Sequence, residues 1–126
     1  MIRSVPWFPM NIDSVRKLCL SFPHATEKLQ WGEELCFKVR GKIFAMVGLA
    51  SVPQTIICKC DPESFAALTE LEGIVPAPYV GRYKWVMLER LDALSDFELR
   101  DVITNSYDLV AAKAKALKNK RAIRTL

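Results

Sequence analysis

The chain has 126 residues, a length that predicts a single domain spanning residues 1–126. Its 51% hydrophobic and 25% charged content excludes a chain that is disordered throughout. No apolar run approaches the roughly 20 residues of a membrane span, and the first ten residues carry two prolines without the apolar stretch of a signal peptide. We therefore expect a cytoplasmic protein without a membrane partner.

The net charge of +4 is unevenly distributed along the chain. Residues 1–112 hold 12 basic and 14 acidic side chains, which leaves this part at −2. Residues 113–126 hold six basic side chains and no acidic one, which gives +6. A role in binding polyanions can therefore be inferred from net charge only for the C-terminal extension.

The four cysteines, at positions 19, 36, 58 and 60, form no C-x-x-C pair, and the chain has one histidine, His24. A zinc site needs about four such ligands in a tetrahedral array, so no metal or other cofactor is expected. The cysteines are predicted to be buried, reduced thiols of an intracellular protein.

The first half of the chain predicts one helix followed by strands. Apolar residues at helical spacing indicate a helix over 11–21, with Asn11 as its cap. Alternation of apolar and polar residues then predicts strands near 29–31, over 35–40 and over 43–47, with a tight turn at Arg40-Gly41. Residues 48–54 are expected to form a loop, and 55–60 a further strand.

Asp61-Pro62 is typical of a helix start, and Gly73 is the expected end of that helix. Two prolines make 74–83 a structured connection, and 84–89 reads as a strand. Ser95 and Glu98 form a capping box ahead of the last helix. The order predicts an α+β, two-layer sandwich: a mainly antiparallel sheet with helices on one face.

No catalytic constellation is present in the sequence, so we expect no enzyme. Phosphate-binding glycine loops and nucleophile motifs are absent, and His24 lies where a surface turn is predicted. The neighbouring glutamates, such as Glu33-Glu34, are typical of a solvated surface. A small-molecule pocket near Trp31, Tyr79 and Trp85 stays open as a poorer alternative.

Three basic features could contact nucleic acid, and each has a structural alternative. Residues 79–85 interleave aromatic and cationic side chains, which can stack on bases and contact phosphates, or can merely pack and point to solvent. Residues 38–42 would make a basic hairpin tip or a solvated sheet face. Cations over 113–126 could contact a polyanion, although helix-dipole stabilisation explains two or three of them.

Several segments resemble the MmcQ/YjbR family: CLSFP (19–23), Trp31-Gly32, FKVRGKIFA (37–45), KCDPESF (59–65), GIVPAPYVGRYKWV (73–86) and LSDFELRDVITNSYDLVAAK (94–113). The match covers about residues 11–113 and leaves 114–126 as a basic extension. His24 departs from the glycine that usually follows the proline in this family. The resemblance implies a DNA-binding protein with a double-wing sheet and a secretion-chaperone-like architecture.

The resemblance places the binding positions at Lys42, Lys59, Arg82, Lys84 and Trp85. Together with the features above, the predicted DNA-binding set is Lys38, Arg40, Lys42, Lys59, Tyr79, Arg82, Lys84, Trp85, Lys118, Lys120 and Arg121. Contacts should be mainly to phosphate, with little base specificity. The alternative is a protein- or peptide-binding adaptor that uses the open sheet face or a sheet edge. The oligomeric state is left open.

Overall fold

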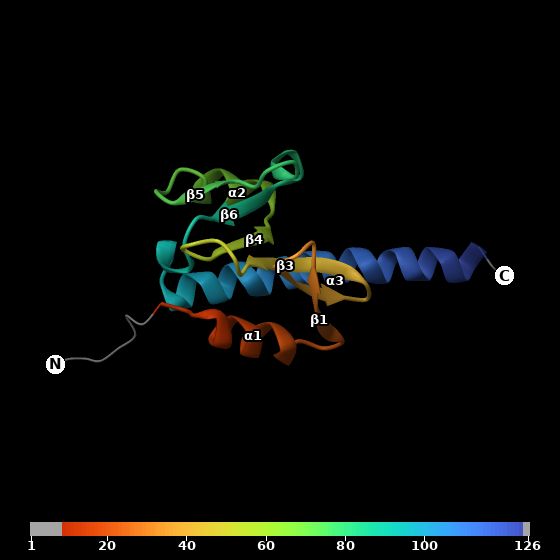
Figure 1. Ribbon diagram of the computed structural model, residues 1–126. Coiled ribbons are helices and arrows are strands. Elements are labelled where there is room, and N and C mark those ends of the chain that lie inside the picture. The colour runs from red at the N-terminus through yellow and green to blue at the C-terminus, as the bar shows by residue number, and fades with distance from the viewer. Residues whose placement is uncertain (1–8, 125–126) are drawn as a thin grey trace.

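The computed structural model describes residues 9–124, with side chains through residue 117. Its helices are α1 (Ile12–Ser21), α2 (Pro62–Leu68) and α3 (Asp96–Arg124), with two short 3-10 turns, η1 (Gly81–Tyr83) and η2 (Leu91–Ala93). Its strands are β1 (Ala25–Gln30), β2 (Glu34–Val39), β3 (Lys42–Gly48), β4 (Thr55–Lys59), β5 (Ile74–Pro76) and β6 (Trp85–Leu88). They form one sheet in the order β1-β2-β3-β4-β6-β5, and every pair is antiparallel (Figure 1). The predicted α+β architecture and its order of elements are confirmed.

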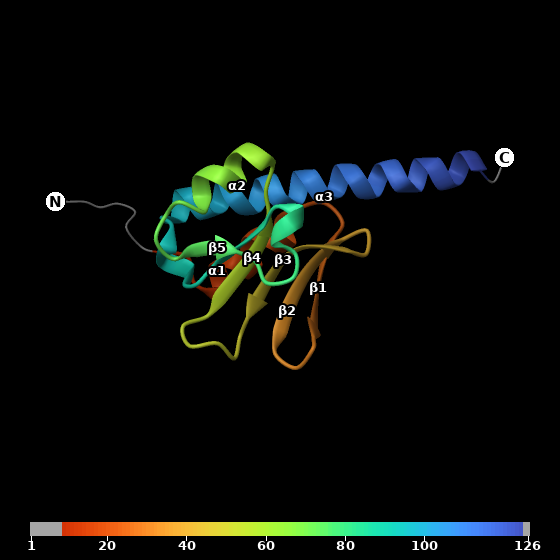
Figure 2. The same cartoon turned by 90° about the horizontal axis from the view of Figure 1, so that it is seen from above.

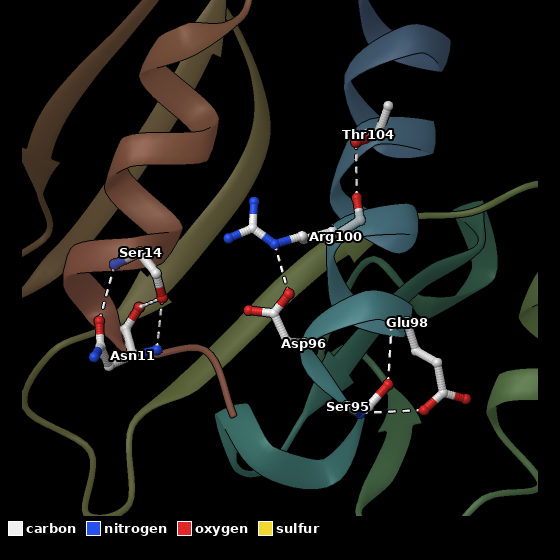
Figure 3. Close-up of polar contacts among 7 residues, drawn as sticks. All are labelled: Asn11, Ser14, Ser95, Asp96, Glu98, Arg100 and Thr104. Atoms are coloured by element: carbon white, nitrogen blue, oxygen red, sulfur yellow. Dashed lines mark hydrogen bonds and ion pairs between the residues drawn. The ribbon is translucent and has the colours of Figure 1, made fainter. Parts of the chain in front are cut away.

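The predicted caps at the starts of α1 and α3 are both present (Figure 3). The backbone N–H of Ser14 donates to the Asn11 side chain at 2.9 Å, and the Ser14 hydroxyl accepts from the Asn11 N–H at 2.9 Å. Ser95 and Glu98 make the same reciprocal pair, at 3.2 and 3.1 Å. These bonds satisfy backbone donors that a helix start leaves free, so local sequence defines where α1 and α3 begin.

Helix α2 begins as predicted and ends earlier than predicted. The Asp61 side chain accepts from the Ser64 N–H at 2.8 Å and caps the first turn. The helix ends at Leu68, and its C-cap residue is Thr69 rather than the predicted Gly73. Gly73 still has a left-handed backbone, with φ of 83°, and serves the turn into β5.

Residues 74–83, expected to be a connection, include a short strand. β5 lies at the edge of the sheet and pairs only with β6, which is where a proline such as Pro76 is tolerated. The following strand starts one residue later than expected, at Trp85. Lys84 has a φ of 71° and closes the 3-10 turn η1 instead of joining the sheet.

The core forms on the face of the sheet that alternation along the strands makes apolar. Its strand contributions include Leu35, Phe37, Val47, Ile56, Cys58, Val86 and Leu88. Val15 and Cys19 of α1 and Leu99 and Ile103 of α3 are fully buried against them. The first half of α3 is thus part of the core layer.

The long helix α3 packs against β3 and β4 and continues well past the sheet (Figure 2). Buried Ser106 fixes the crossing point: its hydroxyl donates to the Phe44 carbonyl at 2.6 Å and accepts from the Lys59 N–H at 2.9 Å. The C-terminal half of α3 is therefore held beside the ends of β3 and β4. Between residues 9 and 124, no helix is both long and apolar enough to cross a membrane.

Candidate nucleic-acid interface

A groove of about 580 Å³ lies where the ends of strands β2, β3, β4 and β6 meet the C-terminal half of α3. We call it the lysine groove, because four lysines line it: Lys38, Lys42, Lys59 and Lys113. Three aromatic side chains, Trp31, Tyr83 and Trp85, line it as well. The sequence-predicted residues that it brings together are Lys38, Lys42, Lys59 and Trp85.

Strand register explains how these side chains meet. Lys59 of β4 pairs with Trp85 of β6, so their side chains are cross-strand neighbours on one face. Lys38 of β2 pairs with Ile43 of β3 on the same face. A bulge next to Lys38 shifts the register of the two strands there, leaving Phe44 without a partner across the pair. Apolar alternation toward the core thus places Lys38, Lys59 and Trp85 on the opposite face.

The wall opposite the sheet comes from the same stripe of α3 that begins in the core. Ser106, Val110, Ala114 and Leu117 follow one another at intervals of three or four residues, which keeps them on one side of the helix. The last three line the lysine groove, together with Lys113. Anchoring of Ser106 between β3 and β4 therefore also positions Lys113.

The groove carries positive charge without a counter-charge of its own. No carboxylate lines it, and none of its lysines forms an ion pair among the described side chains. Partial burial lowers the pKa of Lys59, and the nearby Lys113 ammonium group lowers it further. Since both influences disfavour the charged form of Lys59, an anion bound beside it would favour that charged form.

A second hollow, of about 650 Å³, lies on the other side of the β2–β3 turn. It shares Gly41, Lys42, Ala114 and Leu117 with the lysine groove and adds Arg40 and His24. No carboxylate lines this hollow either. The hairpin tip thus separates two basic depressions, and predicted residue Arg40 belongs to the second one.

Three predicted residues near η1 lie outside the groove. Tyr79 is 97% exposed. The Arg82 guanidinium lies 4.8 Å from the centre of the Tyr83 ring, and the Lys84 ammonium lies 5.0 Å from that of Phe65 on α2. The predicted set 79–85 is therefore split, with Trp85 directed into the groove and Lys84 directed toward α2. The remaining predicted residues, Lys118, Lys120 and Arg121, belong to α3, but their side chains lie outside the described residues.

Three aromatic or cationic residues of the groove are absent from the predicted DNA-binding set: Trp31, Tyr83 and Lys113. Trp31 stands at a predicted strand end and Tyr83 between two cations, so both were visible as aromatic residues near basic ones. Nothing in local spacing places Trp31 next to Trp85, which is 54 positions away. The inclusion of Lys113 could have been predicted from its position beside the apolar stripe of the last helix.

The cysteines and the side chains that could bind a metal are scattered among the described residues. All four cysteines are buried and free, as predicted, and burial raises the pKa of Cys19 to about 12 and that of Cys60 to about 11. Within the described part of the chain, no three side chains of histidine, cysteine, aspartate or glutamate are grouped as metal ligands. The thiols are therefore protonated near neutral pH and weakly nucleophilic.

Comparison with known proteins identifies the family. Residues 20–109 match the family model YjbR, and no match was found among curated proteins. The crystal structure of a Deinococcus radiodurans protein with a DUF419 domain is similar at a TM-score of 0.72 and 27% identity, covering 79% of this chain and 77% of that one. A Pseudomonas syringae protein shares the fold at a TM-score of 0.66 and 20% identity, covering 80% and 99%. The family match spans well over half of the sequence and the fold agrees over four fifths of it, so the chain belongs to the MmcQ/YjbR family.

Proposed function

We propose that the protein binds DNA through the lysine groove, with contacts mainly to phosphate and little base specificity. The observation that carries this proposal is the convergence of Lys38, Lys42, Lys59 and Lys113 on one concave surface without a carboxylate. Phosphate oxygens are the natural partners of such a cluster, and they carry no sequence information. Arg40, in the adjoining hollow, extends the positive surface across the hairpin tip.

Net charge does not carry this proposal, because residues 1–112 are close to neutral. What matters is the local arrangement: the ion pairs among the described side chains, such as Arg16 with Glu27 and Arg100 with Asp96, lie outside the groove. Among those side chains, none forms an ion pair with a groove lysine. Binding is therefore expected to release counterions and to weaken steeply as salt rises.

Two neighbouring lysines on α3 provide a matched test. Both side chains are exposed, but Lys113 lines the groove, whereas Lys115 lines neither basic hollow and points to another side of the helix. Lys113→Ala and Lys115→Ala change net charge and helix propensity equally. Affinity for fluorescein-labelled DNA, both single-stranded and duplex, is measured by anisotropy over a series of salt concentrations.

Lys113→Ala is expected to weaken binding and to reduce the slope of log K against log salt by about 0.7–0.9, the value of one phosphate contact. Lys115→Ala should leave the slope of the parent protein nearly unchanged. If neither form of DNA binds at low salt, or if both variants lose affinity equally, the lysine groove is not a DNA-binding surface.

The adaptor alternative finds less support at the sheet edges. Strand β1 lies at one end of the sheet and pairs only with β2, so its outer edge could accept a peptide. However, Lys28 is exposed in the middle of β1, and charged residues on an edge strand disfavour strand addition. At the other end, Pro76 interrupts the donors of the three-residue β5.

A further inference from the structure

We propose that the lysine groove is built for single-stranded DNA, with unpaired bases stacking on Trp31, Tyr83 and Trp85. This inference rests on the proposed DNA binding and specifies the form of DNA. Phosphate contacts alone would need only the lysines. The aromatic side chains in the same groove need a separate explanation, and a stacked base supplies it.

The exposure of two of these rings is the first argument. Trp31 is 69% exposed and Tyr83 is 55% exposed, so neither contributes its full area to the core. Both nevertheless line the same cavity as the half-buried Trp85. In duplex DNA the base faces are already stacked on one another, so they are not available to protein rings. In a single strand the faces are free, and each base can stack on an aromatic side chain whatever its sequence.

The backbone at Trp31 is the second argument. Its φ is 47°, in the left-handed region that a bulky side chain seldom adopts, and Gly32 follows with φ of 83°. A largely exposed ring gains little packing energy with which to offset this conformation. Non-glycine residues held in such conformations cluster at binding sites. The turn between β1 and β2 therefore holds Trp31 in a fixed conformation that presents its exposed ring at the groove.

Cations also lie beside aromatic rings in and next to the groove, which suits a bound single strand. Lys59 lies beside Trp85 across the β4–β6 pair, and Lys113 lies near Lys59 on the facing wall. The Arg82 guanidinium stacks on the Tyr83 ring and adds a further cation next to it. A strand lying in the groove would place phosphates against the lysines while its bases face the rings.

The test compares a single-stranded oligothymidine with a duplex of the same length at one salt concentration, using the 126-residue chain. Trp31→Ala is the main variant, since the exposed ring should not be needed for folding, and Trp31→Phe keeps an aromatic face. Phe97→Ala is the matched control, because Phe97 is 74% exposed on the first turn of α3 and does not line the groove. Tyr83→Ala replaces the main variant if thermal melting shows that Trp31→Ala is unfolded.

The parent protein is expected to bind the single strand more tightly than the duplex. Trp31→Ala should weaken single-strand binding roughly 5- to 150-fold and leave duplex binding nearly unchanged, whereas Trp31→Phe and Phe97→Ala should behave like the parent. Equal affinity for both forms, or equal loss for both in Trp31→Ala, overturns the single-strand inference and leaves DNA binding standing. Absence of binding to either form overturns both proposals.

Discussion

Ser106 is the residue that links the core to the lysine groove. It is the one fully buried polar side chain among those described, and it bonds both the Phe44 carbonyl and the Lys59 N–H. A hydroxyl suits this position because it donates to one strand and accepts from the other at the same time. Apolar substitution would leave both backbone groups without partners in the interior.

We therefore predict that Ser106→Ala destabilises the protein by about 1–3 kcal/mol, the cost of leaving a buried polar group unsatisfied. Urea denaturation of the parent and variant measures the change. Thr104→Ala is the control, because the Thr104 hydroxyl donates within its own helix, to the Arg100 carbonyl, at 2.7 Å. A loss in Thr104→Ala as large as that in Ser106→Ala would show that the effect does not come from the link to β3 and β4.

Single residues of the candidate site differ in how well the sequence predicts them. Lys38, Lys42, Lys59 and Trp85 could be named in advance, since strand alternation or family resemblance marks each of them. Trp31 could be named only as part of a possible small-molecule pocket with Tyr79 and Trp85, and not as part of a basic surface. Its position near Trp85 depends on the order of the strands across the whole sheet, a tertiary property that no local pattern encodes.

At the level of elements, the hairpin of β2 and β3 holds two of the groove lysines on either side of its turn. Arg40 and Gly41 occupy the turn with φ of 51° and 81°, the left-handed pair typical of a type I′ connection. This geometry matches the twist of the flanking strands and sets the positions of Lys38 and Lys42. The turn predicted from Arg40-Gly41 is thus confirmed, together with its reliance on glycine.

Gly41→Ala is predicted to destabilise the protein by about 1–2 kcal/mol, the cost of forcing an L-residue into the left-handed region. No heavy atom lies within 4 Å of a Cβ added at Gly41, so the cost would come from the backbone and not from a clash. Arg40→Asn is the opposite case: asparagine tolerates this conformation better than arginine, so stability should hold or rise. Thermal melting of Gly41→Ala and Arg40→Asn measures both effects, and equal melting temperatures for the two variants would contradict the prediction.

Most elements that depend on alternation or capping were predictable from sequence, and those at a sheet edge were not. The strand predicted near 29–31 is the edge strand β1, which spans Ala25–Gln30 and leaves Trp31 in the turn. The caps of Asn11 and Ser95 and the periods of the strands are local, so the corresponding elements follow directly. β5 is only three residues long and exists because β6 lies beside it. The early end of α2 likewise reflects the need for the chain to turn into that edge pair.

For the whole molecule, positive charge is concentrated in the lysine groove and in the basic C-terminal extension, and helix α3 contributes to both. The first half of α3 belongs to the core, and its middle forms the wall of the lysine groove. Its end, which runs past the sheet (Figure 2), carries the basic extension. Deleting residues 113–126 would remove Lys113, Ala114 and Leu117, and so would destroy the groove together with the extension. A cut after Leu117 separates the two.

Removal of residues 118–126 leaves 14 basic and 14 acidic side chains, so the shortened protein has no net charge. We predict that it still binds DNA and keeps the effect of Lys113→Ala, because the lysines of the groove remain in place. The slope of log K against log salt should become shallower by about 0.7–0.9 for each phosphate that Lys118, Lys120 or Arg121 contacts. Anisotropy titrations of the two chain lengths measure this change. Complete loss of binding at low salt would instead assign the interaction to the extension, since a neutral protein with an intact groove would then have no affinity for phosphate.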